Sequence, residues 1–119
     1  MSFAIQSQEL GTVRVIAIRG ELDLHTAPQL EESVEAALED SERPLAIDLS
    51  ACEFIDSTGI ALIVRAWRQL SDDANGAPAG RFALCGLSDQ VQRLFQITGL
   101  ESLIPMHDNL DEALAELNG

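Results

Sequence analysis

The chain has 119 residues, of which 46% are hydrophobic, and a formal net charge of −13 from 7 Lys+Arg and 20 Asp+Glu. This length and composition suit one globular domain over residues 1–119, with a core that needs neither disulfides nor metal ions. The negative charge disfavours nucleic acids and anionic membrane surfaces as partners. Charge therefore argues against two classes of partner without identifying one.

The sequence also allows expectations about the cellular location of the protein, the state of its cysteines and its metal content. The first residues show no basic segment or long apolar run of a secretory signal peptide, and no apolar stretch approaches the roughly 20 residues that cross a bilayer. We therefore expect a soluble, cytoplasmic protein. Cys52 and Cys85 lie in or beside apolar segments and are expected to be reduced, buried thiols. His25 and His107 are too few and too far apart for a metal site, so no metal or cofactor is predicted.

The first half of the chain predicts a hairpin and a helix. Apolar residues at Phe3 and Ile5 alternate with polar ones, and residues 13–19 are rich in β-branched side chains, so both segments are predicted strands. The short turn at residues 10–12 favours an antiparallel pairing. Residues 20–25 form a predicted loop leading to a helix start, where Thr26 and Gln29 fit a capping box. The apolar face of this helix is predicted to consist of Leu30, Val34, Ala37 and Leu38.

The second half alternates strands and helices. Residues 45–49 predict a short buried strand, residues 51–59 a polar loop, and apolar residues from Ile60 onward a helix ending near Ser71. A turn-rich loop at 72–80 is followed by a predicted strand at 81–85 and a helix that is capped by Ser88 and ended by Gly99. Residues 103–106 predict an edge strand at best, and the last helix is capped by Asn109. The order β-β-α-β-α-β-α-(β)-α predicts an α/β fold, with a mixed sheet of four to five strands and about four helices.

Candidate functional residues follow two strands. In an open α/β sheet, functional groups collect where strands end and helices begin. If the strands before residues 20–26 and 51–59 are parallel neighbours, Asp23 and Ser57 lie at the same edge of the sheet. Ser57 stands at a helix start, where free N–H groups and the helix dipole favour an anion such as phosphate. Asp56 is also a competent cap, which makes Ser57 partly redundant in that role.

An enzyme that uses Ser57 or Asp48 is the weaker hypothesis. The residues around Ser57 do not fit the G-x-S-x-G pattern of hydrolases, and neither histidine stands in a recognisable relation to it. An aspartate phosphoacceptor or magnesium ligand at Asp48 would also require an acidic cluster near the first strand and a lysine, and the chain has no lysine. We expect Asp48 instead to accept backbone hydrogen bonds. No catalytic set is predicted.

Four stretches of the chain, in order, resemble the STAS domain family and, within it, the bacterial anti-sigma factor antagonists. They are residues 20–28, 45–50, 54–60 and 91–100. The resemblance implies that Ser57 is phosphorylated by an ATP-binding anti-sigma factor that is also a serine kinase. The unphosphorylated form would bind this kinase and free the sigma factor, and a phosphoserine phosphatase would reset the system. The partner-binding surface is expected to comprise Asp23, Asp56, Ser57, Thr58, Gly59 and Ile60.

Two alternatives accompany this resemblance. Many relatives carry a second serine where this chain has Thr58, so Thr58 is an alternative site of modification. Single STAS domains also resemble cytoplasmic subunits of lipid-trafficking transporters. An accessory subunit of such an ABC transporter is therefore the second functional hypothesis.

Overall fold

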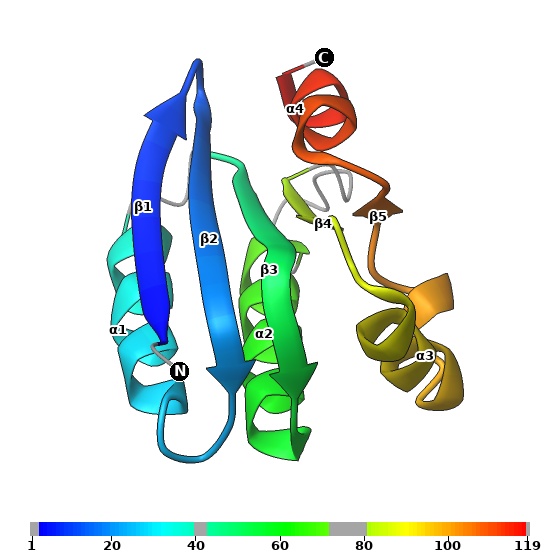
Figure 1. Cartoon of the computed structure of the whole chain (residues 1–119). Helices are drawn as coiled ribbons and strands as arrows, with labels where there is room; N and C mark the ends of the chain where they lie inside the picture. Colours follow the sequence, from blue (N-terminus) through cyan, green and yellow to red (C-terminus); the bar gives the residue numbers. More distant parts are fainter. Residues whose placement is uncertain (1–2, 40–42, 72–80, 119) are drawn as a thin grey trace.

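The computed structural model describes residues 3–39, 43–71 and 81–118, which form one five-stranded sheet and its covering helices (Figure 1). The strands lie side by side in chain order: β1 (Ala4–Leu10), β2 (Val13–Leu22), β3 (Leu45–Ile55), β4 (Phe82–Cys85) and β5 (Met106–His107). β1 runs antiparallel to β2, and the other neighbours are parallel. The helices are α1 (Ala27–Leu38), α2 (Ser57–Ser71), α3 (Asp89–Ile97) and α4 (Leu110–Asn118), with a short 3-10 helix η1 (Leu100–Ser102). The predicted α/β fold is confirmed.

The sheet has two unlike faces. Side chains alternate along β3, so that Leu45, Ile47 and Leu49 join the apolar cluster with α1, α2 and α3. Ala46 points the other way, into a smaller cluster with Ala113 and Leu117 of α4. Figure 1 shows α1 and α2 together behind the sheet, whereas α4 lies near the end of β2 that is remote from the β2–α1 turn. α4 therefore covers the second face at one end of the sheet. The loops that follow β2 and β3 lie at the opposite end.

β2 and β3 are longer than predicted. The expected loops at 20–25 and 51–59 are wrong in their first part, because β2 continues to Leu22 and β3 to Ile55. The β2–β3 register shifts twice, between Ala17 and Arg19 and between Gly20 and Glu21, and each shift adds one residue to β3. Such β-bulges bend a strand and re-aim its side chains. Only short connections remain, at residues 23–26 and at Asp56.

Several predicted helix ends are confirmed. Ser88 caps α3 through a hydrogen bond from the Val91 N–H, and Gly99 follows α3 with a left-handed φ of 78°. Asn109 caps α4 by accepting the Glu112 N–H at 2.9 Å. The predicted edge strand at 103–106 is shifted, since β5 covers only Met106–His107. The predicted loop at 72–80 and the first part of the break at 41–44 lie outside the described residues.

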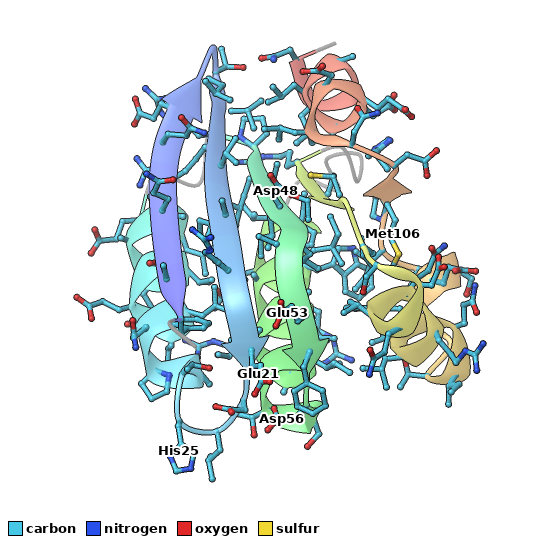
Figure 2. The ribbon with its side chains drawn as sticks, viewed as in Figure 1. Glu21, His25, Asp48, Glu53, Asp56 and Met106 are labelled. Atoms are coloured by element: carbon cyan, nitrogen blue, oxygen red, sulfur yellow. The ribbon has the colours of Figure 1, made fainter. Side chains whose placement is uncertain are left out.

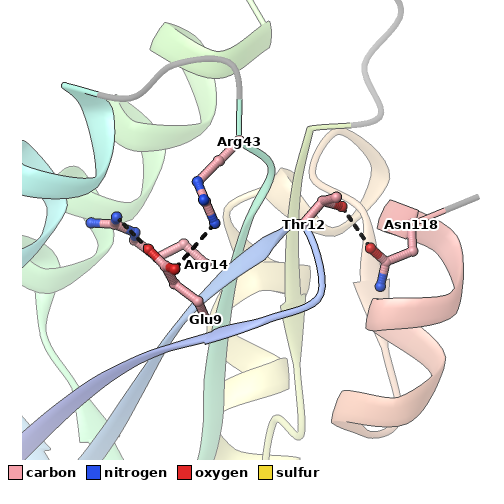
Figure 3. A network of polar contacts seen from close by, with 5 residues as sticks. All are labelled: Glu9, Thr12, Arg14, Arg43 and Asn118. Atoms are coloured by element: carbon pink, nitrogen blue, oxygen red, sulfur yellow. Dashed lines mark hydrogen bonds and ion pairs between the residues drawn. The ribbon is translucent and has the colours of Figure 1, made fainter.

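The hairpin end of the sheet is tied by polar contacts. Figure 3 shows Glu9 between two arginines, at 3.1 Å from Arg14 and 3.3 Å from Arg43. In the same view, the Thr12 hydroxyl donates to the Asn118 side chain at 2.7 Å, which joins the β1–β2 turn to the end of α4. These contacts fix the end of the sheet opposite to the candidate site.

Candidate functional site

The ends of β2 and β3 meet at one edge of the sheet. Leu22 pairs with Ile55 in parallel register, and the Asp56 N–H donates to the Leu22 carbonyl at 3.0 Å. The Leu24 N–H in turn donates to Asp56 Oδ2 at 3.2 Å. The two connections are therefore held to each other by backbone and side-chain hydrogen bonds. This confirms the expectation that the Asp23 and Ser57 segments share one edge.

Asp56 is the cap of α2. Its Oδ1 accepts the N–H groups of Thr58 and Gly59 at 2.9 and 3.1 Å, and its carbonyl accepts the Ile60 N–H at 3.0 Å. A side-chain acceptor at this position satisfies donors that a helix start leaves free. The prediction that Asp56 caps this helix is confirmed, so Ser57 is not needed for that role.

Ser57 is the first residue of α2 and is exposed. Because Asp56 already occupies the N–H groups of Thr58 and Gly59, those two donors are not available to an anion. This differs from the expectation that free N–H groups of the helix start would receive a phosphate. A group attached to the Ser57 hydroxyl would still lie at the positive end of the helix dipole, but next to the Asp56 carboxylate.

Asp23 orders the β2–α1 connection. Its Oδ1 accepts the N–H groups of His25 and Thr26 at 2.9 and 3.1 Å, and its own N–H donates to the Thr26 hydroxyl at 2.9 Å. The hydrogen bond from the Thr26 N–H, followed by that from His25, lowers the pKa of the Asp23 carboxyl below its ordinary value. Thr26 is the N-cap residue of α1, as predicted, but its side chain makes no cap hydrogen bond, so the predicted capping box with Gln29 is wrong. Asp23 and Thr26 form the reciprocal pair instead, three residues earlier, because aspartate is the stronger cap.

Gly59 and Ile60 fasten the start of α2 to the core. A Cβ atom on Gly59 would lie 2.7 Å from the Leu22 side chain and 2.9 Å from Ile55 Cγ2, so the helix can approach the strands only with glycine here. Ile60 is half-buried and packs against the main apolar cluster, while Thr58 is half-buried beside it. Of the predicted partner-binding residues, Ser57 is thus the exposed one, and Gly59 is buried.

Acidic side chains gather around this edge. Figure 2 shows Glu21, Glu53 and Asp56 at the end of the sheet where β2 and β3 finish, with His25 at the tip of the β2–α1 connection. Glu21 and Glu53 are exposed. Glu9, Glu31 and Glu35 form ion pairs with arginines in other parts of the described chain. The edge therefore presents negative charge to any partner.

Two exposed apolar residues at this edge were not predicted from the sequence. The Leu24 residue is 67% exposed and Phe54 is 40% exposed. Phe54 stands opposite Glu21 in the β2–β3 register, two residues before Asp56. The motif around Ser57 contained Phe54, but an aromatic residue beside a buried strand is expected to be core, so the pattern gave no sign of its exposure.

The other candidate groups do not assemble into a reactive site. Asp48 lies within β3, remote from the Ser57 edge in Figure 2, and accepts the Ser50 N–H at 3.0 Å, as expected for a structural role. His107 lies in β5 and His25 in the β2–α1 connection. Within residues 3–39, 43–71 and 81–118, no three metal-ligating side chains cluster and no helix has the length and apolarity to cross a membrane. Cys52 and Cys85 are free and buried, as predicted.

Ser57 is exposed and lies outside the hollow next to this edge. A hollow of about 760 Å³ lies nearby, on the face of the sheet between β2, β3 and the start of α3, and its lining includes Arg19, Glu53 and Ser88. Ser57 does not line this hollow. An exposed serine on a protruding edge suits contact with a large partner better than enclosure of a small molecule.

Comparisons with known proteins identify the family to which this fold and sequence belong. Residues 4–113 match the model of the STAS domain. The chain is 33% identical to the anti-sigma-B factor antagonist of Listeria monocytogenes over 100% of this chain and 97% of that protein. It is 31% identical to the one from Staphylococcus aureus over 81% and 84% of the two chains.

Solved structures give the same result. The crystal structure of an anti-sigma factor antagonist from Mycobacterium paratuberculosis has a TM-score of 0.86 and 30% identity, covering 99% of this chain and 96% of that chain. The Bacillus cell fate determinant SpoIIAA in its phosphorylated form has a TM-score of 0.72 and 26% identity, covering 96% and 99%. The chain belongs to the STAS domain family and, within that family, to the anti-sigma factor antagonists.

Proposed function

We propose that this antagonist is switched by phosphorylation of Ser57. In its unphosphorylated form it binds an ATP-binding anti-sigma factor through the edge formed by Asp23, Asp56, Ser57, Thr58 and Ile60, and the sigma factor is released. The anti-sigma factor is the serine kinase that modifies Ser57, and a phosphoserine phosphatase restores binding. Antagonists of this family are regulators and not enzymes.

The observation that carries the proposal is the exposed Ser57 at an edge that the hydrogen bonds of Asp56 hold together. The Asp56 carboxylate holds the start of α2 and the β2–α1 connection at once, so the serine is presented on a fixed surface. A kinase can reach the hydroxyl without opening the fold. Thr58, the alternative acceptor, is half-buried and lies one residue further into the helix, which favours Ser57.

Phosphate at Ser57 would oppose binding by charge. Phosphorylation adds about −1.5 to −2 charges at neutral pH. The new charge lies beside Asp56, whose carboxylate already occupies two helix N–H groups, so little in the chain itself neutralises it. Burying an unpaired charge at the centre of an interface removes a few kcal/mol, and each 1.4 kcal/mol lowers the affinity about tenfold. No change of fold is required.

The test combines the purified chain with each ATP-binding anti-sigma factor encoded in its own genome. We expect one of them to bind, to transfer one phosphate per chain from ATP, and to release the phosphorylated product. Ser57→Ala should bind without accepting phosphate, and Ser57→Asp should not bind. Thr58→Ala is the control for the alternative acceptor and should still accept one phosphate per chain.

Two results would contradict the proposal. One is phosphate incorporation into Ser57→Ala at the level of the unmodified chain. The other is capture of membrane ATPase subunits from cells without any kinase, which would support the transporter hypothesis instead.

A further inference from the structure

A bulge turns one aromatic side chain of β3 toward the surface. The buried residues Cys52 and Ile55 are three positions apart, whereas strict alternation would bury residues 52 and 54. The extra residue is Glu53, because Gly20 pairs with Cys52 while the next residue, Glu21, pairs with Phe54. The bulge thus buries Ile55 in place of Phe54, and Phe54 is left 40% exposed. A large aromatic group is held at the surface by the strand geometry.

Leu24, in the β2–α1 connection, is the second exposed apolar residue at this edge. Its side chain belongs to a residue that is 67% exposed, although its backbone N–H is fixed by the Asp56 carboxylate at 3.2 Å. Neither apolar residue is therefore on a loose segment. Because the backbone at both residues is fixed in the free protein, less conformational entropy is lost when a partner covers them.

The surroundings of these two residues are acidic. Phe54 stands between Glu53 along the strand and Glu21 across it, and Leu24 is adjacent to Asp23 and bonded to Asp56. An apolar centre within a charged rim is the usual anatomy of a protein interface. The negative rim requires a partner surface whose rim is positive.

We propose that Leu24 and Phe54 are the main affinity anchors of this antagonist, and that they enter an apolar recess framed by arginine or lysine side chains on the anti-sigma factor. This assignment rests on the proposed function, and it divides the edge into two roles. Leu24 and Phe54 supply binding energy, and the acidic side chains supply orientation and speed of encounter. Ser57 directly follows Asp56, whose carboxylate is bonded to the Leu24 amide, so a phosphate there would bring its charge into the apolar contact and not to the basic frame around it.

The test measures dissociation constants of the anti-sigma factor for Leu24→Ala and Phe54→Ala by titration calorimetry. Probes are the ATP-binding anti-sigma factors of the same genome and the anti-sigma-B factor of Listeria monocytogenes. Leu103→Ala and Ile97→Ala are matched controls. Leu103 is 58% exposed and follows η1, and Ile97 is 74% exposed and is the last residue of α3. Melting temperatures of all variants confirm that each is folded.

We expect Phe54→Ala to weaken binding at least tenfold and Leu24→Ala at least threefold, because a few central apolar residues dominate most interfaces. Both controls should bind within twofold of the unmodified chain. The double variant Glu21→Gln, Glu53→Gln should associate more slowly and depend less on salt.

The outcomes separate this inference from the proposed function. If Ser57→Asp abolishes binding while Leu24→Ala and Phe54→Ala bind as the unmodified chain does, the anchors are wrong and the switch stands. If the controls weaken binding as much as Phe54→Ala, the contact lies on α3 and the inference is likewise overturned. If no probe binds the unmodified chain, the proposed function fails, and the inference fails with it.

Discussion

The Asp56 carboxylate lies 3.2 Å from the Leu24 amide nitrogen, while its other oxygen caps α2. One side chain therefore fixes both the helix that presents Ser57 and the connection that presents Leu24. These two segments are 32 residues apart in sequence, and the contact makes them one surface.

Asp56→Ala should loosen both parts of the edge. Loss of the cap is expected to lower the free energy of unfolding by about 1 kcal/mol, within the range of 0.5–2 known for such substitutions. Hydrogen exchange of the Leu24, Thr58 and Gly59 amides should accelerate together. Asp56→Asn retains an acceptor and is the matched control. Faster exchange at Thr58 and Gly59 with no change at Leu24 would show that the hydrogen bond from Leu24 to Asp56 does not stabilise the β2–α1 connection.

Gly59→Ala should be destabilising despite the good helix propensity of alanine. The added methyl would approach the Leu22 side chain to 2.7 Å and Ile55 to 2.9 Å. Overpacking of this kind costs about 1–3 kcal/mol. Denaturant unfolding measures the effect, and Ser57→Ala, at an exposed position in the same turn, should change the stability by less than about 0.5 kcal/mol. Equal stability of the two variants would mean that α2 can move away from the strands without cost.

Asp23 should make the stability depend on pH in the acid range. Hydrogen bonds from Thr26 and His25 lower the pKa of its carboxyl in the folded chain below the ordinary value of about 3.9. The stabilisation is therefore complete above about pH 4 and is lost as pH falls through the lower, folded-state pKa. Asp23→Asn should melt at a lower temperature than the unmodified chain at pH 7, and the difference should shrink at pH 3. A difference that does not vary with pH would rule out this contribution of the charged form.

The sequence was sufficient for the fold but not for the ends of the two central strands. Buried residues of β3 follow the spacing of two at Leu45, Ile47 and Leu49, and then fall three apart at Cys52 and Ile55. The two bulges cause this change of phase, so the alternation that identifies a strand stops at Leu49 although the pairing continues. The prediction that a loop begins at Gly20 was wrong for a related reason. Gly20 lies within β2, with a φ of 96°, at the second bulge.

The position of the candidate site could be predicted from the sequence, but not all of the residues that form its surface. Parallel strands joined by a right-handed crossover bring their carboxyl ends to one edge, so the proximity of Asp23 to Ser57 followed from topology. The exposure of Phe54 did not, because it depends on the bulge at Glu53 and not on residue type. The shared use of Asp56 by two segments also required coordinates, since no local pattern signals a hydrogen bond across 32 residues.

Both cysteines should be unreactive in the folded chain. Burial, with a further contribution from Asp48, raises the pKa of the Cys85 thiol to about 12, and burial also raises that of Cys52. Because the thiolate is the reactive form, a disulfide reagent at pH 8 should modify neither thiol of the native chain quickly. Both thiols should react once denaturant unfolds it. Rapid native labelling of Cys52, identified by mass spectrometry, would show that the end of β3 opens readily.

Phosphorylation of Ser57 should alter the surface of the chain without altering its fold. The hydrogen bonds of Asp56 hold the start of α2 independently of the serine side chain, so a phosphate there displaces no existing contact of the hydroxyl. Chemical-shift changes in amide NMR spectra of the phosphorylated chain should be confined to residues 22–26 and 53–60, where the added charge lies. The free energy of unfolding should change by less than about 1 kcal/mol, because the helix dipole favours the charge and Asp56 opposes it. Shifts that extend into β4 or α4 would instead mean that the switch works through a rearrangement of the sheet.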